Sequence, residues 1–238
     1  DGGAGAGDTL NIVATVAIAA FVDVTVTNME VINLTSNAGI TNTSTTWGAT
    51  EVNATNSTAG VVNLTTAATT AVTASNTVAA AMTITGGLSQ TSTSTGAAVT
   101  LSGSVGPIIA TLSTQGANNV VIDGGTTVNV TTTGGLATGL VGVGATTGST
   151  GAVTVSTTGN FTTGADITYG AITVRGGTSN SITTATGVTA AETLAAVSDT
   201  DNKTITMPAV TVTGLATTTD ATISHPATVT VKDGVVAI

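Results

Sequence analysis

The sequence predicts an all-β fold, with a β-solenoid-like repetitive N-terminal half followed by a sandwich-like β region. Thr makes up about a quarter of the 238 residues, and Val is interleaved with it at short intervals. Both side chains are β-branched and suit a pleated backbone better than a helix. The chain has only four aromatic residues, so its core must consist of Val, Ile, Ala and Leu. Such a thin core favours stacked β-layers over a round interior.

The stretch from Glu51 to Thr85 shows this composition most clearly. It contains no aromatic residue, no proline, no base and a single acid. Its apolar and hydroxyl side chains alternate, and its small residues allow one strand-turn unit to stack closely on the next. The stretch is typical of a chain that repeats and assembles rather than one that holds a reactive group.

The N-terminal segments are predicted first as a glycine-rich lead-in over residues 1–8 and an apolar segment over residues 9–20. Residues 21–27 then alternate, with Val22, Val24 and Val26 on one face. A period of two residues indicates a half-buried strand.

An apolar-Asn-apolar-Thr pattern recurs along the chain, at Ile32–Thr35, Val52–Thr55, Val62–Thr65 and Val128–Thr131. The first three copies begin 20 and then 10 residues apart. Recurrence at these intervals is expected of stacked solenoid rungs that contain one or two strands each.

From Gly86 onward, longer turns are predicted over residues 86–96 (GGLSQTSTSTG) and 102–107 (SGSVGP). Further turns are expected at Asp123-Gly124-Gly125, Gly176-Gly177 and Asp233-Gly234. The candidate strands between these turns are 98–102, 119–122, 127–131, 153–156, 167–169, 171–174, 204–207, 210–213 and 227–232. Residues 188–197 are expected to form one helical turn. We therefore divide the chain into residues 1–95 and 96–238, with one continuous domain as the alternative.

Charge and cysteine content exclude several classes of function. Twelve acids and three bases give a net charge of −9 and a pI near 4.1, so the Lys and Arg that neutralise phosphates are missing. We expect no nucleic-acid partner. The absence of cysteine excludes disulfides and thiolate chemistry. The longest apolar run, Ile12 to Val22, is about half the ~20 residues of a spanning helix, which predicts no membrane insertion.

Three stretches resemble the Thr/Ala/Val/Gly-rich β-strand-repeat proteins of bacterial surfaces, a class that includes S-layer proteins with RTX-type calcium repeats. They are residues 2–10 (GGAGAGDTL), residues 28–35 (NMEVINLT), and residues 170–174 with 176–178 (GAITV, GGT). The resemblance implies a secreted, self-assembling lattice or fibre protein at the bacterial cell surface, organised by Ca²⁺. The chain departs from the RTX loop because Gly7 stands where that loop has Asp, with Asp8 one place late.

The candidate calcium ligands are Asp199, Asp201, Asp123 and Asp8. Asp199 and Asp201 alternate with other oxygen-bearing side chains in the densest carboxylate cluster, and Ca²⁺ takes six to eight oxygen ligands. Asp123 and Asp8 lie beside glycines. At all four positions the alternative is a surface turn without an ion.

No catalytic residues are predicted, and the chain is not expected to be an enzyme. The one histidine, His225, lies between Ser224 and Pro226, and an adjacent Ser-His pair is not the signature of a triad. Trp47 is expected either to anchor a subunit contact or to cap a turn locally. Thr-x-Thr runs at 41–45 and 91–95 suggest an ice-binding surface, but their spacing does not repeat a hydroxyl pair on every rung.

The sequence therefore predicts a structural surface protein that polymerises into an S-layer lattice or a filament. Low charge and strands that lack Lys or Pro leave edges open to strand addition between subunits. The expected partners are copies of the chain itself and cell-surface polysaccharide. The alternative is an adhesin or glycan-binding module of a larger surface protein.

Overall fold

The structure is a computed structural model of the chain, and it describes residues 3–19, 26–134, 139–159, 167–168, 170–185, 203–206, 209–213, 220–224 and 229–231. Every regular element in these ranges is a β-strand, which confirms the predicted all-β class. The predicted helical turn at 188–197 and most of the alternating segment at 21–27 lie outside the described residues.

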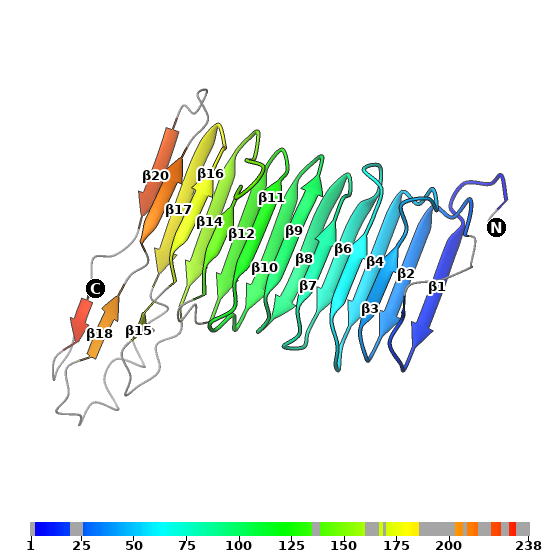
Figure 1. Cartoon of the computed structure of the whole chain (residues 1–238), viewed down its shortest axis with the longest axis horizontal. Helices are drawn as coiled ribbons and strands as arrows, with labels where there is room; N and C mark the ends of the chain where they lie inside the picture. The colour runs from blue at the N-terminus through cyan, green and yellow to red at the C-terminus, as the bar shows by residue number, and fades with distance from the viewer. Residues whose placement is uncertain are drawn as a thin grey trace.

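Two long sheets run the length of the molecule, with each strand beside its neighbour in a continuous stack (Figure 1). Sheet A contains, in spatial order, β1 (Thr9–Ala14), β2 (Val31–Ser36), β4 (Glu51–Asn56), β6 (Ala71–Asn76), β8 (Ser89–Thr95), β10 (Ile108–Ser113), β12 (Val128–Thr133), β14 (Val153–Thr158), β17 (Ser179–Ala185) and β20 (Asp220–Ser224). Sheet B contains β19 (Val210–Thr213), β16 (Ile172–Arg175), β13 (Val141–Val143), β11 (Val120–Gly124), β9 (Val99–Ser104), β7 (Met82–Thr85), β5 (Val62–Thr65) and β3 (Ile40–Thr43). Neighbouring strands within each of these sheets are parallel.

A third, smaller sheet contains β15 (Ile167–Thr168), β18 (Lys203–Thr206) and β21 (Val229–Val231). β15 and β18 are parallel, whereas β18 and β21 are antiparallel.

The chain alternates between sheet A and sheet B, so that each pair of strands forms one rung of a solenoid. Leu34 pairs with Ala54, and Ala54 with Ala74, which makes one rung 20 residues long in this part of the chain. The 10-residue offset in the Asn repeat places β5 in the opposite sheet from β4. The predicted solenoid is therefore confirmed, with two strands in each rung.

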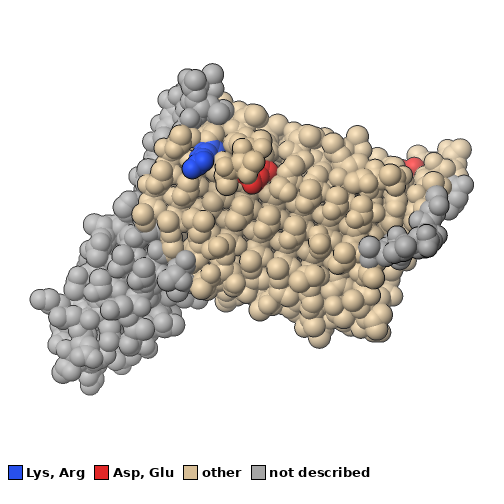
Figure 2. Space-filling model, viewed as in Figure 1, with Lys and Arg blue, Asp and Glu red and all other residues tan. Residues whose placement is uncertain are grey.

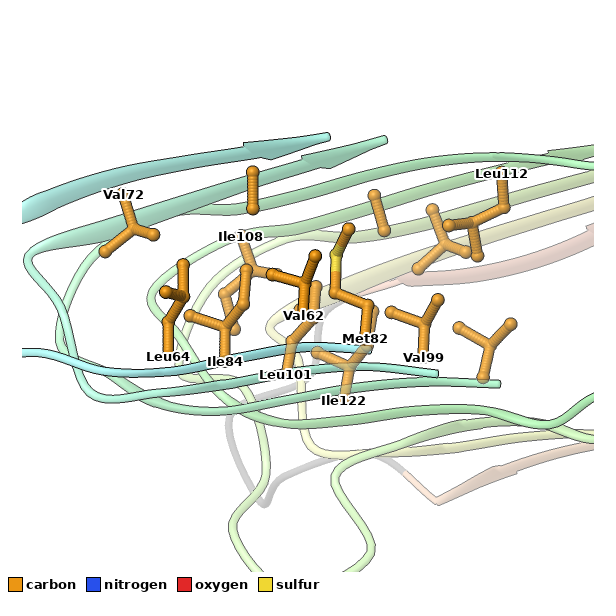
Figure 3. Close-up of a cluster of buried hydrophobic side chains, with 14 of the residues drawn as sticks. Val62, Leu64, Val72, Met82, Ile84, Val99, Leu101, Ile108, Leu112 and Ile122 are labelled. Atoms are coloured by element: carbon orange, nitrogen blue, oxygen red, sulfur yellow. The ribbon is translucent and has the colours of Figure 1, made fainter. Parts of the chain in front are cut away.

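Inward-facing aliphatic side chains from the two sheets fill the space between them (Figure 3). On sheet B, successive strands stack Val62 on Met82 on Val99, and a parallel column begins with Leu64. Fully burying such a side chain contributes about 1.5–3 kcal/mol, so the rungs stabilise one another through these columns. Trp47 is only 6% exposed and belongs to this core, which supports local packing over a subunit contact.

Both sheets continue across residue 95 without a change of direction. β8 pairs with β10 in sheet A, and β7 pairs with β9 in sheet B. The later strands of sheets A and B thus extend the same two facing sheets and remain parallel.

The segment GGLSQTSTSTG, predicted as a turn, contains the whole of β8, so that prediction is wrong. Gln90, Ser92 and Ser94 face inward and are buried. The Gln90 amide nitrogen donates to the carbonyl oxygens of Gly86 at 2.5 Å and Ser102 at 2.8 Å. Because the inward positions are polar, the apolar alternation that marks a strand in the sequence is missing.

Buried polar side chains also form a row inside one edge of sheet A, in the order Ser36, Asn56, Asn76 and Ser94. The Asn56 amide nitrogen donates to Asn76 Oδ1 at 3.0 Å and to the carbonyl oxygens of Ala59 and Gly60 at 2.9 and 2.8 Å. Asn56 Oδ1 accepts from the Gly39 amide at 3.1 Å. These bonds hold the corner between the sheets to the strand end, because they give hydrogen-bond partners to corner peptide groups that lie outside the strand ladder.

Candidate functional site

The N-terminal end of the solenoid combines an edge strand with partly uncovered apolar side chains. β1 is the last strand of sheet A and pairs only with β2 among the described strands. Its inward-facing side chains Leu10, Ile12 and Ala14 are partly buried, whereas Ile32 and Leu34 on the next strand are fully buried. The end rung therefore leaves part of the apolar core in contact with solvent.

Exposed apolar side chains extend this surface. Val13 is 79% exposed and Val16 is 68% exposed, and β1 contains no Lys, Arg or Pro. Those are the residues that commonly protect an edge strand from pairing with another chain. The end of sheet A is therefore chemically suited to strand addition.

β1 is nevertheless held firmly in register on β2. The carbonyl oxygen of Asp8 accepts hydrogen bonds from the amides of Glu30 and Val31, at 3.0 and 3.1 Å. Asn33 Nδ2 donates to Asn11 Oδ1 at 2.7 Å across the two strands. The edge is thus a preformed template, since no further ordering of β1 is needed before a strand is added.

An apolar groove of about 550 Å³ lies at the same end, on the side of sheet B. Ile18, Ile40 and Val61 contribute its larger side chains. Ile18 joins this edge through a single parallel bridge to Ile40. Both sheets therefore end in apolar surface at this rung.

The structure separates the predicted calcium ligands that it describes. Asp8 precedes β1 of sheet A, whereas Asp123 lies near the end of β11 in sheet B. Asp199 and Asp201 lie outside the described residues. Among the described ranges, no group of three or more His, Cys, Asp or Glu side chains is placed to hold a metal ion.

Asp8 lies close to a second carboxylate, that of Glu30. The Asp8 amide donates to Glu30 Oε2 at 2.8 Å, and Asp8 Oδ2 is buried without a hydrogen-bond partner in the described structure. The Asp8 main chain is thus joined to the Glu30 carboxylate at the end rung. No local pattern predicts this contact, because the two residues are 22 positions apart.

Asp123 caps a loop. Its Oδ1 accepts hydrogen bonds from the amides of Thr146 at 2.8 Å and Thr147 at 3.3 Å. This loop connects β13 of one rung to β14 of the next, so the carboxylate joins successive turns of the solenoid.

Replacing Asp123 with Ala is expected to lower the free energy of unfolding by about 1 kcal/mol, because two loop amides lose their acceptor. Asp123→Asn retains an Oδ1 acceptor and serves as the matched control, with a smaller loss. Urea denaturation of both variants measures the difference. Equal losses in the two variants would show that the carbonyl-type acceptor is not what stabilises the loop.

His225, the one histidine of the chain, lies outside the described residues, and Arg175 is an exposed residue at the end of β16. No helix long and apolar enough to cross a membrane occurs in the described part of the chain. The sequence does not single out Val13 and Val16, because the apolar run from Ile12 to Val22 does not indicate which of its side chains the fold leaves exposed.

Comparison of the chain with protein-family models, with curated proteins and with solved structures found no match to any of them.

Proposed function

We propose that this chain is a structural, self-assembling extracellular surface protein that forms an S-layer lattice or a filament through strand-edge contacts. The observation that carries the proposal is the end rung, where a preformed strand edge coincides with a partly uncovered apolar core. A neighbouring copy that added a strand to β1 would pair the edge and cover Leu10 and Ile12 together.

The polarity of the stack supports a head-to-tail contact. Sheet A has β1 at one end and β20 at the other, and all its strands run in the same direction. Joining unlike ends continues the parallel ladder, and such a heterologous contact leaves a free end on each copy. Repetition of the contact then yields an open filament or one row of a lattice.

The proposal includes a role for Ca²⁺ in bringing acidic copies of the chain together. Asp8 and Glu30 place two acidic residues at the end rung, where they would repel further acidic groups brought there by a second copy, and a divalent cation would offset that repulsion. The whole chain has more acids than bases, so copies of it repel one another, and calcium-rich surroundings would reduce this repulsion during assembly. Cell-surface polysaccharide is the proposed anchor, and the proposal includes no catalytic role.

Introducing Lys at both Val13 and Val16 is expected to reduce assembly strongly, because two charges at the edge would have to be desolvated when a strand is added. Both positions are more than two-thirds exposed, so the folded rung should tolerate the change. Sedimentation velocity and negative-stain electron microscopy, each with Ca²⁺ and with a chelator, measure the assembly.

The matched control places Lys at Leu88 and Val105, which are 49% and 53% exposed and lie at corners in the middle of the stack. This control should assemble as the unmodified chain does. The proposal fails if the unmodified chain stays monomeric at high concentration with Ca²⁺ present. Binding of that monomer to a glycan array would favour the adhesin alternative instead.

A further inference from the structure

The outward face of sheet A carries an unbroken column of hydroxyl side chains. In register from β2 to β17, this column consists of Thr35, Thr55, Ser75, Thr93, Thr111, Thr131, Ser156 and Thr183. None of these residues is buried. We call this column, together with its outward-facing neighbours on β8, β10, β12 and β14, the hydroxyl face.

Neighbouring columns widen the hydroxyl face to three positions on four consecutive strands. A second column on β8, β10, β12 and β14 consists of Thr95, Ser113, Thr133 and Thr158. The third column on the same strands consists of Thr91, Ile109, Asn129 and Thr154. These twelve positions contain no charged side chain.

The alignment of these hydroxyl residues cannot be recognised from their spacing along the chain. The steps along the chain from Thr93 to Thr111, to Thr131 and to Ser156 are 18, 20 and 25 residues, so no fixed period appears. The corners absorb the differences, and the paired strands keep the side chains aligned. The Thr-x-Thr runs at 41–45 and 91–95 begin in different sheets, on β3 of sheet B and on β8 of sheet A, so only the second run contributes to the hydroxyl column of sheet A.

The opposite face of the solenoid provides an internal comparison. Outward positions of sheet B include Val121, Asp123, Gly142 and Arg175, which interrupt the hydroxyl side chains of its other strands. The face of the molecule in Figure 2 shows only isolated acidic and basic groups among its described residues. Sheet B keeps an uninterrupted hydroxyl column over four strands, from Thr43 to Ser102, whereas the column of sheet A runs over eight strands.

The spacing between strands on the hydroxyl face is close to the separation of two oxygen atoms bridged by one tetrahedral water. Neighbouring strands lie about 4.8 Å apart, and alternate residues on one strand lie about 6.6 Å apart. Two oxygen atoms that share one tetrahedral water at hydrogen-bond distances of about 2.75 Å lie about 4.5 Å from each other. One water can therefore bridge hydroxyls on adjacent strands, and the same step repeats from strand to strand.

The eight hydroxyls of the central column, which runs from Thr35 to Thr183, are available to bond water. None of the eight donates to or accepts from another group in the described structure, so their hydrogen-bonding capacity is directed to water. Six of the eight residues are Thr, whose side chain is restricted at χ1. Ordering water on this face therefore needs little rearrangement of the protein.

We propose that the hydroxyl face binds the surface of an ice crystal by holding an ordered layer of water on its columns. The strands lie nearly side by side over many rungs (Figure 1), so the contact extends in two directions. The absence of charge in the array removes the groups that would orient water differently. This activity uses the face of sheet A, whereas the proposed self-assembly uses its edge.

The test uses the purified chain and measures thermal hysteresis on single ice crystals, together with inhibition of ice recrystallisation. The chain is expected to shape the crystal and to produce hysteresis. Thr93→Lys with Thr111→Lys should reduce hysteresis several-fold, because two long charged side chains lift the ice surface off the central column. Both positions are exposed, and circular dichroism checks that the variant remains folded.

The matched control introduces Lys at Thr43 and Thr85, two exposed outward positions on sheet B. It should retain the hysteresis of the unmodified chain. No effect of the unmodified chain on ice, or an equal loss in the two variants, would overturn the proposal. Sedimentation of the same samples shows whether self-assembly is intact, which separates failure of this inference from failure of the proposed function.

Discussion

Replacing Asn56 with Ala is expected to destabilise the folded monomer by about 3 kcal/mol or more. The side chain is fully buried, and its removal leaves the Gly39 amide and the carbonyl oxygens of Ala59 and Gly60 without their partner. Each buried group left unpaired costs about 1–3 kcal/mol. Urea denaturation, followed by the fluorescence of the single buried Trp47, measures the loss.

Asn63→Ala is the matched control because Asn63 is an exposed strand residue on β5. Its removal should change the free energy of unfolding by only a few tenths of a kcal/mol. If the two variants had the same denaturation midpoint, the buried Asn row would not be what secures the corner.

Gly60→Ala is expected to have the second large effect, because Gly60 meets two separate constraints. Its φ is +84°, a region that side chains with a Cβ rarely adopt, and an added Cβ would overlap the carbonyl oxygen of Ala38 on the neighbouring rung. The rungs would have to separate locally to accommodate it. We expect a loss of several kcal/mol and faster hydrogen exchange at the amides of β3 and β5.

Gly48→Ala isolates the first constraint, since Gly48 has φ +77° but no atom within 4 Å of the added Cβ. It should cost about 1–2 kcal/mol from backbone strain alone. Similar losses at Gly48 and Gly60 would mean that close approach between the rungs contributes nothing to stability.

The sequence was sufficient to predict the fold class because its repeat coincides with the rung. The apolar-Asn-apolar-Thr pieces at Ile32–Thr35 and Val52–Thr55 lie in register on β2 and β4, and the third piece, Val62–Thr65, is β5. The strand at Ser89–Thr95 was missed because its inward residues are polar and find partners only through the tertiary structure. A period of two in hydrophobicity marks strands only where the core is apolar.

The candidate surfaces were less predictable from the sequence. Exposure of Val13 depends on which strand ends the stack, and the local sequence does not carry that information. The proximity of Glu30 to Asp8 and the alignment of Thr93 with Thr111 likewise depend on strand pairing across 18 or more residues. Residue types could be read from the sequence, but their neighbours could not.

The connections between rungs differ in length while the strands stay aligned. Residues 125–127 connect β11 to β12, whereas residues 144–152 connect β13 to β14 at the equivalent corner one rung later. The pairing of Val128 with Val153 is unaffected by the six additional residues. Insertions and deletions at this corner therefore leave the paired strands in place. The loops at this corner can vary in length, and foreign peptides can be displayed in them.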